Sequence, residues 1–165
     1  MQKQDWQYKK EVIKGNIGED IVRVYLESKG YIVYEPVTDG PHHFDKLISK
    51  DKKILAIVEI KTYERLKFKP ETGINLKNYK EYLDIKNIEV FVFFVDYITE
   101  SIYGNKLSIL SKQIEINKTF YPYVMKSVTG DKQMFHLKSM IEISKLKKDD
   151  CIHLKNKTNI NKKYI

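Results

Sequence analysis

Residues 53–63, KILAIVEIKTY, constrain the fold of this chain more than any other stretch. From Ile54 to Ile60 every residue except Glu59 is a branched aliphatic or alanine, which is typical of a strand buried on both faces. Side chains alternate along a strand, so Glu59 and Lys61 are expected to leave its end on the same face. Buried charges are costly unless something uses them, and we therefore interpret this strand end as the candidate site.

The segments around this strand predict an α/β fold with a mixed central sheet flanked by helices. A strand at 44–49 and a tight turn should form an antiparallel hairpin with it, which can bring Asp45 toward Glu59. A helix at 76–85 followed by a strand at 88–96 predicts a parallel crossover. The remaining expectations are a helix at 7–29 that starts late, near Asn16, a strand at 31–36, an irregular stretch at 64–75, a strand or ribbon at 101–110, a strand at 133–137 and a closing amphipathic helix at 138–148.

Length and composition predict one domain, 1–148, followed by a basic extension, 149–165. The chain has 165 residues and 42% apolar side chains, enough for one core. From Cys151 onward there are four lysines and no acid, which favours a mobile tail outside the core. No apolar run is long enough to span a bilayer and the start lacks a secretory signal, so we expect a soluble, cytoplasmic protein with no membrane contact. A single cysteine excludes an internal disulfide.

The residues that could carry chemistry are Glu19, Asp45, Glu59 and Lys61. Two neighbouring carboxylates repel each other and stay ionised when a cation lies between them. Oxygen ligands suit a hard divalent ion, Mg²⁺ above all, which can polarise a phosphodiester and acidify water. An amine two residues after a ligand can orient that water or neutralise charge on the phosphate. Glu19 would act through a water molecule or hold a second metal.

Asp45, the Glu59-Ile60-Lys61 run and the preceding helix with Glu19 resemble the PD-(D/E)XK nuclease superfamily, the restriction endonuclease-like fold that Holliday-junction resolvases share. The resemblance covers roughly residues 16–96 and implies an αβββαβ core. It implies that Asp45, Glu59 and the Ile60 carbonyl bind Mg²⁺, with Mn²⁺ able to substitute, and that Lys61 assists the water. The helix after the crossover would add a polar residue, Tyr79 or Lys80. Family members are often dimers, which leaves a homodimer open.

The pattern departs from the family at one position and has to be separated from chance. Phe44 stands where the family has proline, and Asp39 is an alternative to Asp45. Acid-x-Lys occurs four times in this lysine-rich chain, so the bare motif carries little information. The copy at Glu59 differs from the others because it ends an apolar strand, follows Asp45 on the preceding strand, and comes after a helix with Glu19.

A net charge of +8 favours a polyanionic partner, and we expect nucleic acid, most simply DNA. The first hypothesis is a metal-dependent DNA endonuclease. The second is an inactive module of the same fold that binds nucleic acid or a protein partner, and the third is a structural protein in which Glu59 and Lys61 form an internal ion pair. Residues that could contact a nucleic acid or its phosphates are Lys67, Lys69, Lys77, Tyr79, Lys80, His42, His43, Tyr121 and Tyr123, with solvation or packing as the alternative for each.

Overall fold

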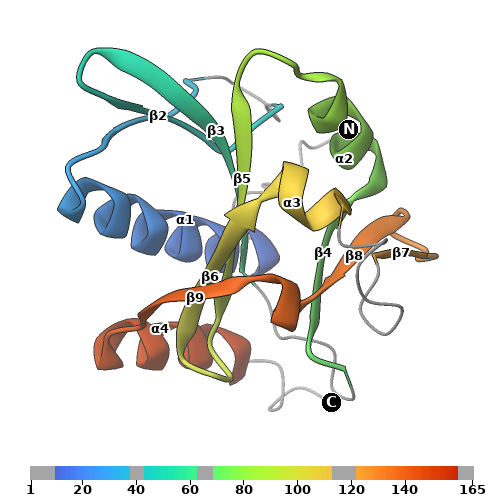
Figure 1. Ribbon diagram of the computed structural model, residues 1–165. Coiled ribbons are helices and arrows are strands. Elements are labelled where there is room, and N and C mark those ends of the chain that lie inside the picture. The colour runs from blue at the N-terminus through green and yellow to red at the C-terminus, as the bar shows by residue number, and fades with distance from the viewer. Residues whose placement is uncertain (1–9, 38–42, 63–68, 113–121, 160–165) are drawn as a thin grey trace, which may run out of the picture.

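The structure is a computed structural model that describes residues 10–37, 43–62, 69–112 and 122–159 (Figure 1). Helices and strands are interspersed along this part of the chain. Their bounds are α1 (Lys10–Ser28), β1 (Ile32–Tyr34), β2 (Lys46–Lys50), β3 (Lys53–Thr62), β4 (Glu71–Asn75), α2 (Leu76–Asp84), β5 (Glu89–Asp96), β6 (Ser101–Lys106), α3 (Leu107–Lys112), β7 (Tyr123–Met125), β8 (Lys132–His136), the 3₁₀ turn η2 (Leu137–Ser139), β9 (Ile141–Lys145) and α4 (Lys148–Asn159).

A six-stranded mixed sheet in the order β1-β2-β3-β5-β6-β9 forms the centre of the molecule. Strands β2 and β3 pair antiparallel with Lys46 opposite Val58, which confirms the predicted hairpin. Strands β3 and β5 pair parallel with Ile60 opposite Phe93, which confirms the crossover through α2. The α/β architecture and the αβββαβ order, in which β4 is an added strand before α2, are therefore as predicted.

The central strands bury side chains on both faces of the sheet, and the two faces have separate cores. Ala56, Val58 and Ile60 of β3 belong to the core beneath α1 and α4. Ile57 belongs to the core on the opposite face, which also contains Tyr82 of α2. The strand period of two therefore assigns every residue of β3 to one face or the other.

Two segments form strands where the sequence predicted other structure. Residues 71–75 were expected to be irregular, but β4 pairs with β8 in a second sheet of order β4-β8-β7, seen beneath α2 in Figure 1. Residues 138–148 were expected to be a helix, but β9 pairs with the edge of β6. Ile141, Glu142, Ile143 and Ser144 alternate with the strand period, and β6 offers unpaired backbone groups that a helix could not satisfy.

Helices α1 and α4 both pack on the core of Ala56, Val58 and Ile60 (Figure 1). The stretch from residue 149 was expected to lie outside the core, yet Cys151 and Leu154 are buried, so the packed structure continues into α4. The expected late start of α1 is also wrong, because the helix already includes residues 10–15. Among the described helices, none is long and apolar enough to cross a membrane.

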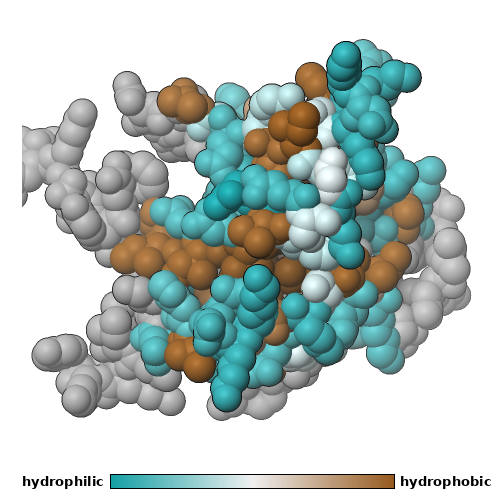
Figure 2. All heavy atoms as spheres, turned by 90° about the vertical axis from the view of Figure 1, so that its left-hand side faces the viewer, coloured by the Kyte–Doolittle hydropathy of each residue, from teal (hydrophilic) through white to brown (hydrophobic). Residues whose placement is uncertain are grey.

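A wide groove of about 860 Å³ opens between the C-terminal turns of α1 and the sheet. Apolar side chains such as Leu55, Phe91 and Ile141 line it together with Lys50 and Lys106. Figure 2 shows the face on which α1 ends, where a band of hydrophobic side chains runs between hydrophilic residues. The groove lies away from the end of β3 that carries Glu59.

Candidate active site

The C-terminal end of β3 carries Glu59 and Lys61 on the face of the sheet that α2 covers. Glu59 has the same strand parity as Ile57, and only 1% of its surface is exposed. Its Oε2 accepts a hydrogen bond from the Tyr82 hydroxyl at 2.5 Å, and its Oε1 lies 2.5 Å from Lys61 Nζ. Oε1 is buried without an aligned hydrogen bond in the described structure, so its contact with Lys61 is an ion pair with poor directionality. A buried carboxylate oxygen in this state is suited to a further ligand.

Asp45 approaches Glu59 from the residue just before β2. Its Oδ2 accepts a hydrogen bond from the Ile60 backbone N–H at 2.5 Å, which holds the carboxylate against the end of β3. Burial and the negative charge of Glu59 raise the pKa of Asp45 to about 7, against the opposing effects of Lys61 and the Ile60 N–H. The structure thus brings Asp45, Glu59 and Lys61 together, with two acids close enough to repel each other.

These residues fit a small hard cation better than a metal that needs a full protein cage. Within residues 10–37, 43–62, 69–112 and 122–159, no group of three or more His, Cys, Asp or Glu side chains could hold a metal ion. The site instead offers two carboxylates, one of which has an incompletely bonded oxygen. Mg²⁺ is usually bound by one or two carboxylates and keeps several waters, so this donor set suits it.

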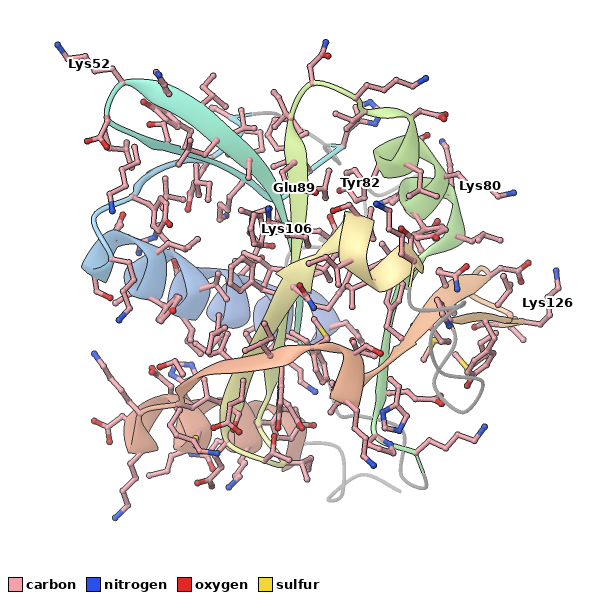
Figure 3. The ribbon with its side chains drawn as sticks, viewed as in Figure 1. Lys52, Lys80, Tyr82, Glu89, Lys106 and Lys126 are labelled. Atoms are coloured by element: carbon pink, nitrogen blue, oxygen red, sulfur yellow. The ribbon has the colours of Figure 1, made fainter. Side chains whose placement is uncertain are left out.

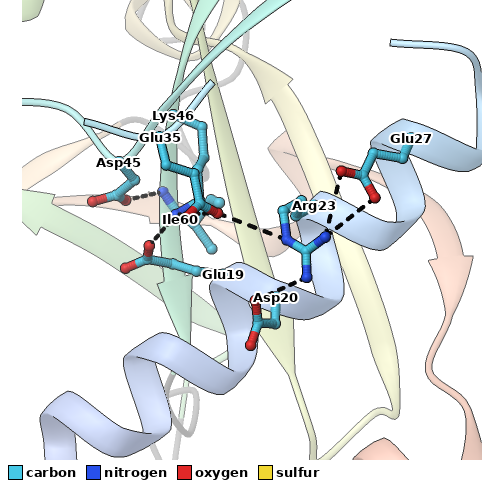
Figure 4. Close-up of polar contacts among 8 residues, drawn as sticks. All are labelled: Glu19, Asp20, Arg23, Glu27, Glu35, Asp45, Lys46 and Ile60. Atoms are coloured by element: carbon cyan, nitrogen blue, oxygen red, sulfur yellow. Dashed lines mark hydrogen bonds and ion pairs between the residues drawn. The ribbon is translucent and has the colours of Figure 1, made fainter. Parts of the chain in front are cut away.

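Glu19 lies on the other face of the sheet from Glu59. Its Oε2 is 2.6 Å from Lys46 Nζ, and Lys46 also lies 3.3 Å from Glu35 (Figure 4). Burial acts to lower the pKa of Lys46, but the hydrogen bonds and negative charges of Glu19 and Glu35 together outweigh it and the pKa is raised. Lys46 was not among the residues predicted for the site, because a lysine in a lysine-rich hairpin gives no signal by itself.

A close contact between α1 and β3 sets the position of Glu19. Gly18 is buried, and a Cβ built on it would lie 1.7 Å from Thr62 Oγ1, two residues beyond Ile60. The absence of a side chain at this position therefore lets the helix lie against the end of β3. In the sequence, the glycine signalled only a weak helix.

Helix α2 contributes Tyr82 to the site, whereas Tyr79 or Lys80 was expected. Tyr79 packs against Phe135 with ring centroids 5.9 Å apart, and Lys80 is exposed and points away from the sheet (Figure 3). The Tyr82 hydroxyl also lies 2.8 Å from the His43 carbonyl, so it ties α2 to the segment before Asp45. Its pKa is raised by burial and by Glu59, so the hydroxyl remains a donor. The sequence placed Tyr82 on the apolar side of the helix without indicating this contact.

Most of the other residues predicted to contact nucleic acid lie at the surface or outside the described residues. Lys69 and Lys77 are exposed, with Lys69 lying over the Tyr123 ring and Lys77 lying 3.8 Å from Glu81. The His43 ring is 90% exposed. Asp39, His42, Lys67 and Tyr121 lie outside the described residues.

A scan against protein-family models and a search of curated proteins give no match. Two solved structures are similar in fold. A Holliday junction resolvase from Archaeoglobus fulgidus has a TM-score of 0.52 and 12% identity, covering 78% of this chain and 96% of its own. A nuclease from a fusselovirus has a TM-score of 0.58 and 13% identity, covering 95% of this chain and 98% of its own. The chain has a restriction endonuclease-like fold. In this fold, Asp45, Glu59 and Lys61 lie at the end of the central hairpin and helix α2 closes over them.

Proposed function

We propose that this chain is a Mg²⁺-dependent nuclease that cuts phosphodiester bonds within DNA. The observation that carries the proposal is the meeting of Asp45 and Glu59 at the end of β3, with Lys61 beside them. The net charge of +8 favours a polyanionic substrate. The similar structure from Archaeoglobus fulgidus is named for its action on a DNA junction, which supports DNA over RNA.

The Asp45 carboxylate, Glu59 Oε1 and the Ile60 carbonyl would hold the ion. The N–H and C=O of one strand residue point to the same side of the strand. Because the Ile60 N–H donates to Asp45, the Ile60 carbonyl is directed to the Asp45 side as well. A divalent ion at this position supplies Lewis acidity toward a phosphate oxygen and makes water a better nucleophile near neutral pH. Mn²⁺ is expected to substitute.

Lys61 and Tyr82 prepare the site for this chemistry. Lys61 is 27% exposed, so its ammonium can donate to a phosphate oxygen or to the attacking water at the protein surface. The Tyr82 hydroxyl donates to Glu59 Oε2 and leaves Oε1 for the ion. The exposed Lys69 and Lys77 remain predictions as contacts to the nucleic acid backbone, and a homodimer remains a prediction as well.

The test is a cleavage assay on supercoiled, linear, branched and single-stranded DNA, with RNA for comparison, in Mg²⁺, Mn²⁺ or EDTA. We expect cleavage that depends on the divalent ion and is lost in Glu59→Ala and Lys61→Ala. Glu81→Ala, which removes an exposed acid of α2, is the matched control and should cut like the parent protein. Equal cleavage by Glu59→Ala, Lys61→Ala and the parent would refute the site. DNA binding that is salt-sensitive but shows no cleavage in any metal would support the inactive binding module instead.

A further inference from the structure

A second group of charged side chains lies on the α1 face of the same hairpin, close to the candidate metal site. Lys46 is its centre, with a side chain that is 7% exposed and an ammonium 2.6 Å from Glu19 and 3.3 Å from Glu35. Arg23 lies 3.7 Å from Glu35 and also pairs with Asp20 and Glu27 (Figure 4). Each carboxylate in this group therefore has a cationic partner from the protein itself.

The strand period separates Lys46 from Glu59. In β2, Ile48 packs on the core beneath α1 and Leu47 packs on the core beneath α2. Lys46 shares the parity of Ile48 and faces α1, whereas Glu59 shares the parity of Ile57 and faces α2. Asp45 precedes β2 and meets the end of β3 through the Ile60 N–H, and the negative charge of Glu19 contributes to the raised pKa of Asp45. Glu19 itself bonds to Lys46 on the α1 face.

The charges of the two groups leave room for one divalent cation. Glu19, Glu35, Asp45 and Glu59 are four carboxylates, and Lys46, Lys61 and Arg23 are the three cations that pair with members of this set. The difference of one negative charge can be met by a single divalent ion and leaves no excess of carboxylates for a second one. It arises on the Asp45 side, because Lys46 and Arg23 compensate Glu19 and Glu35. A second divalent ion beside Glu19 would face the buried ammonium of Lys46 at short range, where repulsion is strong.

We infer that Lys46 takes the place of a second cation, so that the centre binds one divalent ion and Glu19 is not one of its ligands. The inference rests on the proposed metal site and assigns Glu19 and Lys46 a positioning role beside it. It differs from the expectation drawn from sequence, in which Glu19 acts through water or holds a second metal. Asn16, Glu19, Glu35 and Lys46 line a polar cavity of about 220 Å³, so a cation entering it beside Glu19 would meet the Lys46 ammonium.

The experiment counts Mn²⁺ ions bound per chain by electron paramagnetic resonance of free Mn²⁺, together with calorimetric titration, in the absence of DNA. We expect one ion in the parent protein and one in Lys50→Met, which removes an exposed lysine from the same strand. Lys46→Met frees Glu19 and Glu35 and should bind two ions. Combining Lys46→Met with Glu19→Gln removes the freed acid and should restore the count of one.

Further variants keep the result decisive if Lys46→Met does not fold. Glu19→Gln should still bind one ion with an affinity lowered less than tenfold, whereas Asp45→Asn should lose at least a hundredfold. Two ions in the parent protein, one ion in a folded Lys46→Met, or an equal loss of affinity in Glu19→Gln and Asp45→Asn would overturn the inference and leave the proposed nuclease standing. No bound ion in the parent protein would refute the metal site itself, and the inference would fail with it.

Discussion

The two charged groups on opposite faces of the β2–β3 hairpin differ in how completely their charges are compensated. On the α1 face, Lys46 contacts both Glu19 and Glu35. On the α2 face, Asp45 and Glu59 repel each other, and Glu59 Oε1 has no aligned hydrogen bond among the described residues. The same strands thus carry a closed ion-pair network and an open pair of acids, one on each face.

This difference indicates which group is built for stability and which for chemistry. A buried ion pair holds its two residues in place. Removing one partner is strongly destabilising, because the remaining charge stays buried without compensation. Uncompensated acids lower stability in the free protein, and a bound cation recovers that energy. Changes on the α1 face should therefore alter folding first, and changes on the α2 face should alter activity first.

The largest effect is expected for Glu59→Gln on the α2 face. The amide oxygen can still accept a hydrogen bond from the Tyr82 hydroxyl, but the substitution removes the negative charge that would hold the ion. Cleavage in Mg²⁺ should fall about a thousandfold or more, equivalent to ~4 kcal/mol of transition-state stabilisation. The free energy of unfolding should fall by less than about 1 kcal/mol, because a buried charge is lost with it. Cleavage rates and urea denaturation measure both, and a collapse of stability with activity would contradict the distinction between the faces.

The pair of acids on the α2 face was the part of the site that the sequence could predict. Glu59 and Lys61 stand out because they interrupt an apolar strand, and the short turn predicts the hairpin that brings Asp45 to them. The period of two, which is a local property of the backbone, then assigns the face. The central sheet was predictable for the same reason, since each of its main strands is a short apolar run.

The ion-pair network on the α1 face and the second sheet could not be predicted, because both depend on contacts between residues that are distant in sequence. Lys46 pairs with an acid 27 residues away, and β4 finds its partner in β8 about 60 residues later. The sequence indicates only that Tyr82 lies on the apolar side of α2, whereas the structure shows that its hydroxyl donates to Glu59. For β9, the alternation of Ile141 and Ile143 was a usable signal, but the helical interpretation of 138–148 overrode it.

The next largest effect should come from Gly18→Ala, which acts on the α1 face. The added Cβ would overlap Thr62, so α1 must move away from β3 and carry Glu19 with it. We expect a loss of about 2 to 3 kcal/mol in unfolding free energy. Gly15→Ala is the control, since a Cβ there meets nothing within 4 Å and should add about 0.5 to 1 kcal/mol through helix propensity. Equal effects of the two variants in thermal denaturation would rule out a tight contact at Gly18.

A smaller loss of stability is expected when Lys46, the centre of the ion-pair network on the α1 face, is replaced. Lys46→Met should lower the free energy of unfolding by about 2 kcal/mol, less than for a fully buried pair because Glu19 and Glu35 are partly exposed. Lys50→Met, at the exposed end of β2, should stay within about 0.5 kcal/mol of the parent protein. Chemical denaturation in EDTA gives both values. Similar losses in the two variants would show that Lys46 does not hold the α1 face together.

The last effect is a pH dependence that arises from Asp45 on the side of the site that α2 covers. Because the pKa of Asp45 is raised to about 7 in the folded protein, the folded state keeps a proton that the unfolded chain releases near pH 4. Its contribution to stability is present below about pH 4 and is lost as the pH rises through about 7 when no metal is bound. Asp45→Asn removes this titration while its side-chain oxygen can still accept the Ile60 N–H. Melting temperatures of the parent protein and Asp45→Asn in EDTA should therefore diverge between pH 4 and pH 7, with the variant becoming relatively more stable. Parallel curves would mean that Asp45 is compensated like the acids on the α1 face.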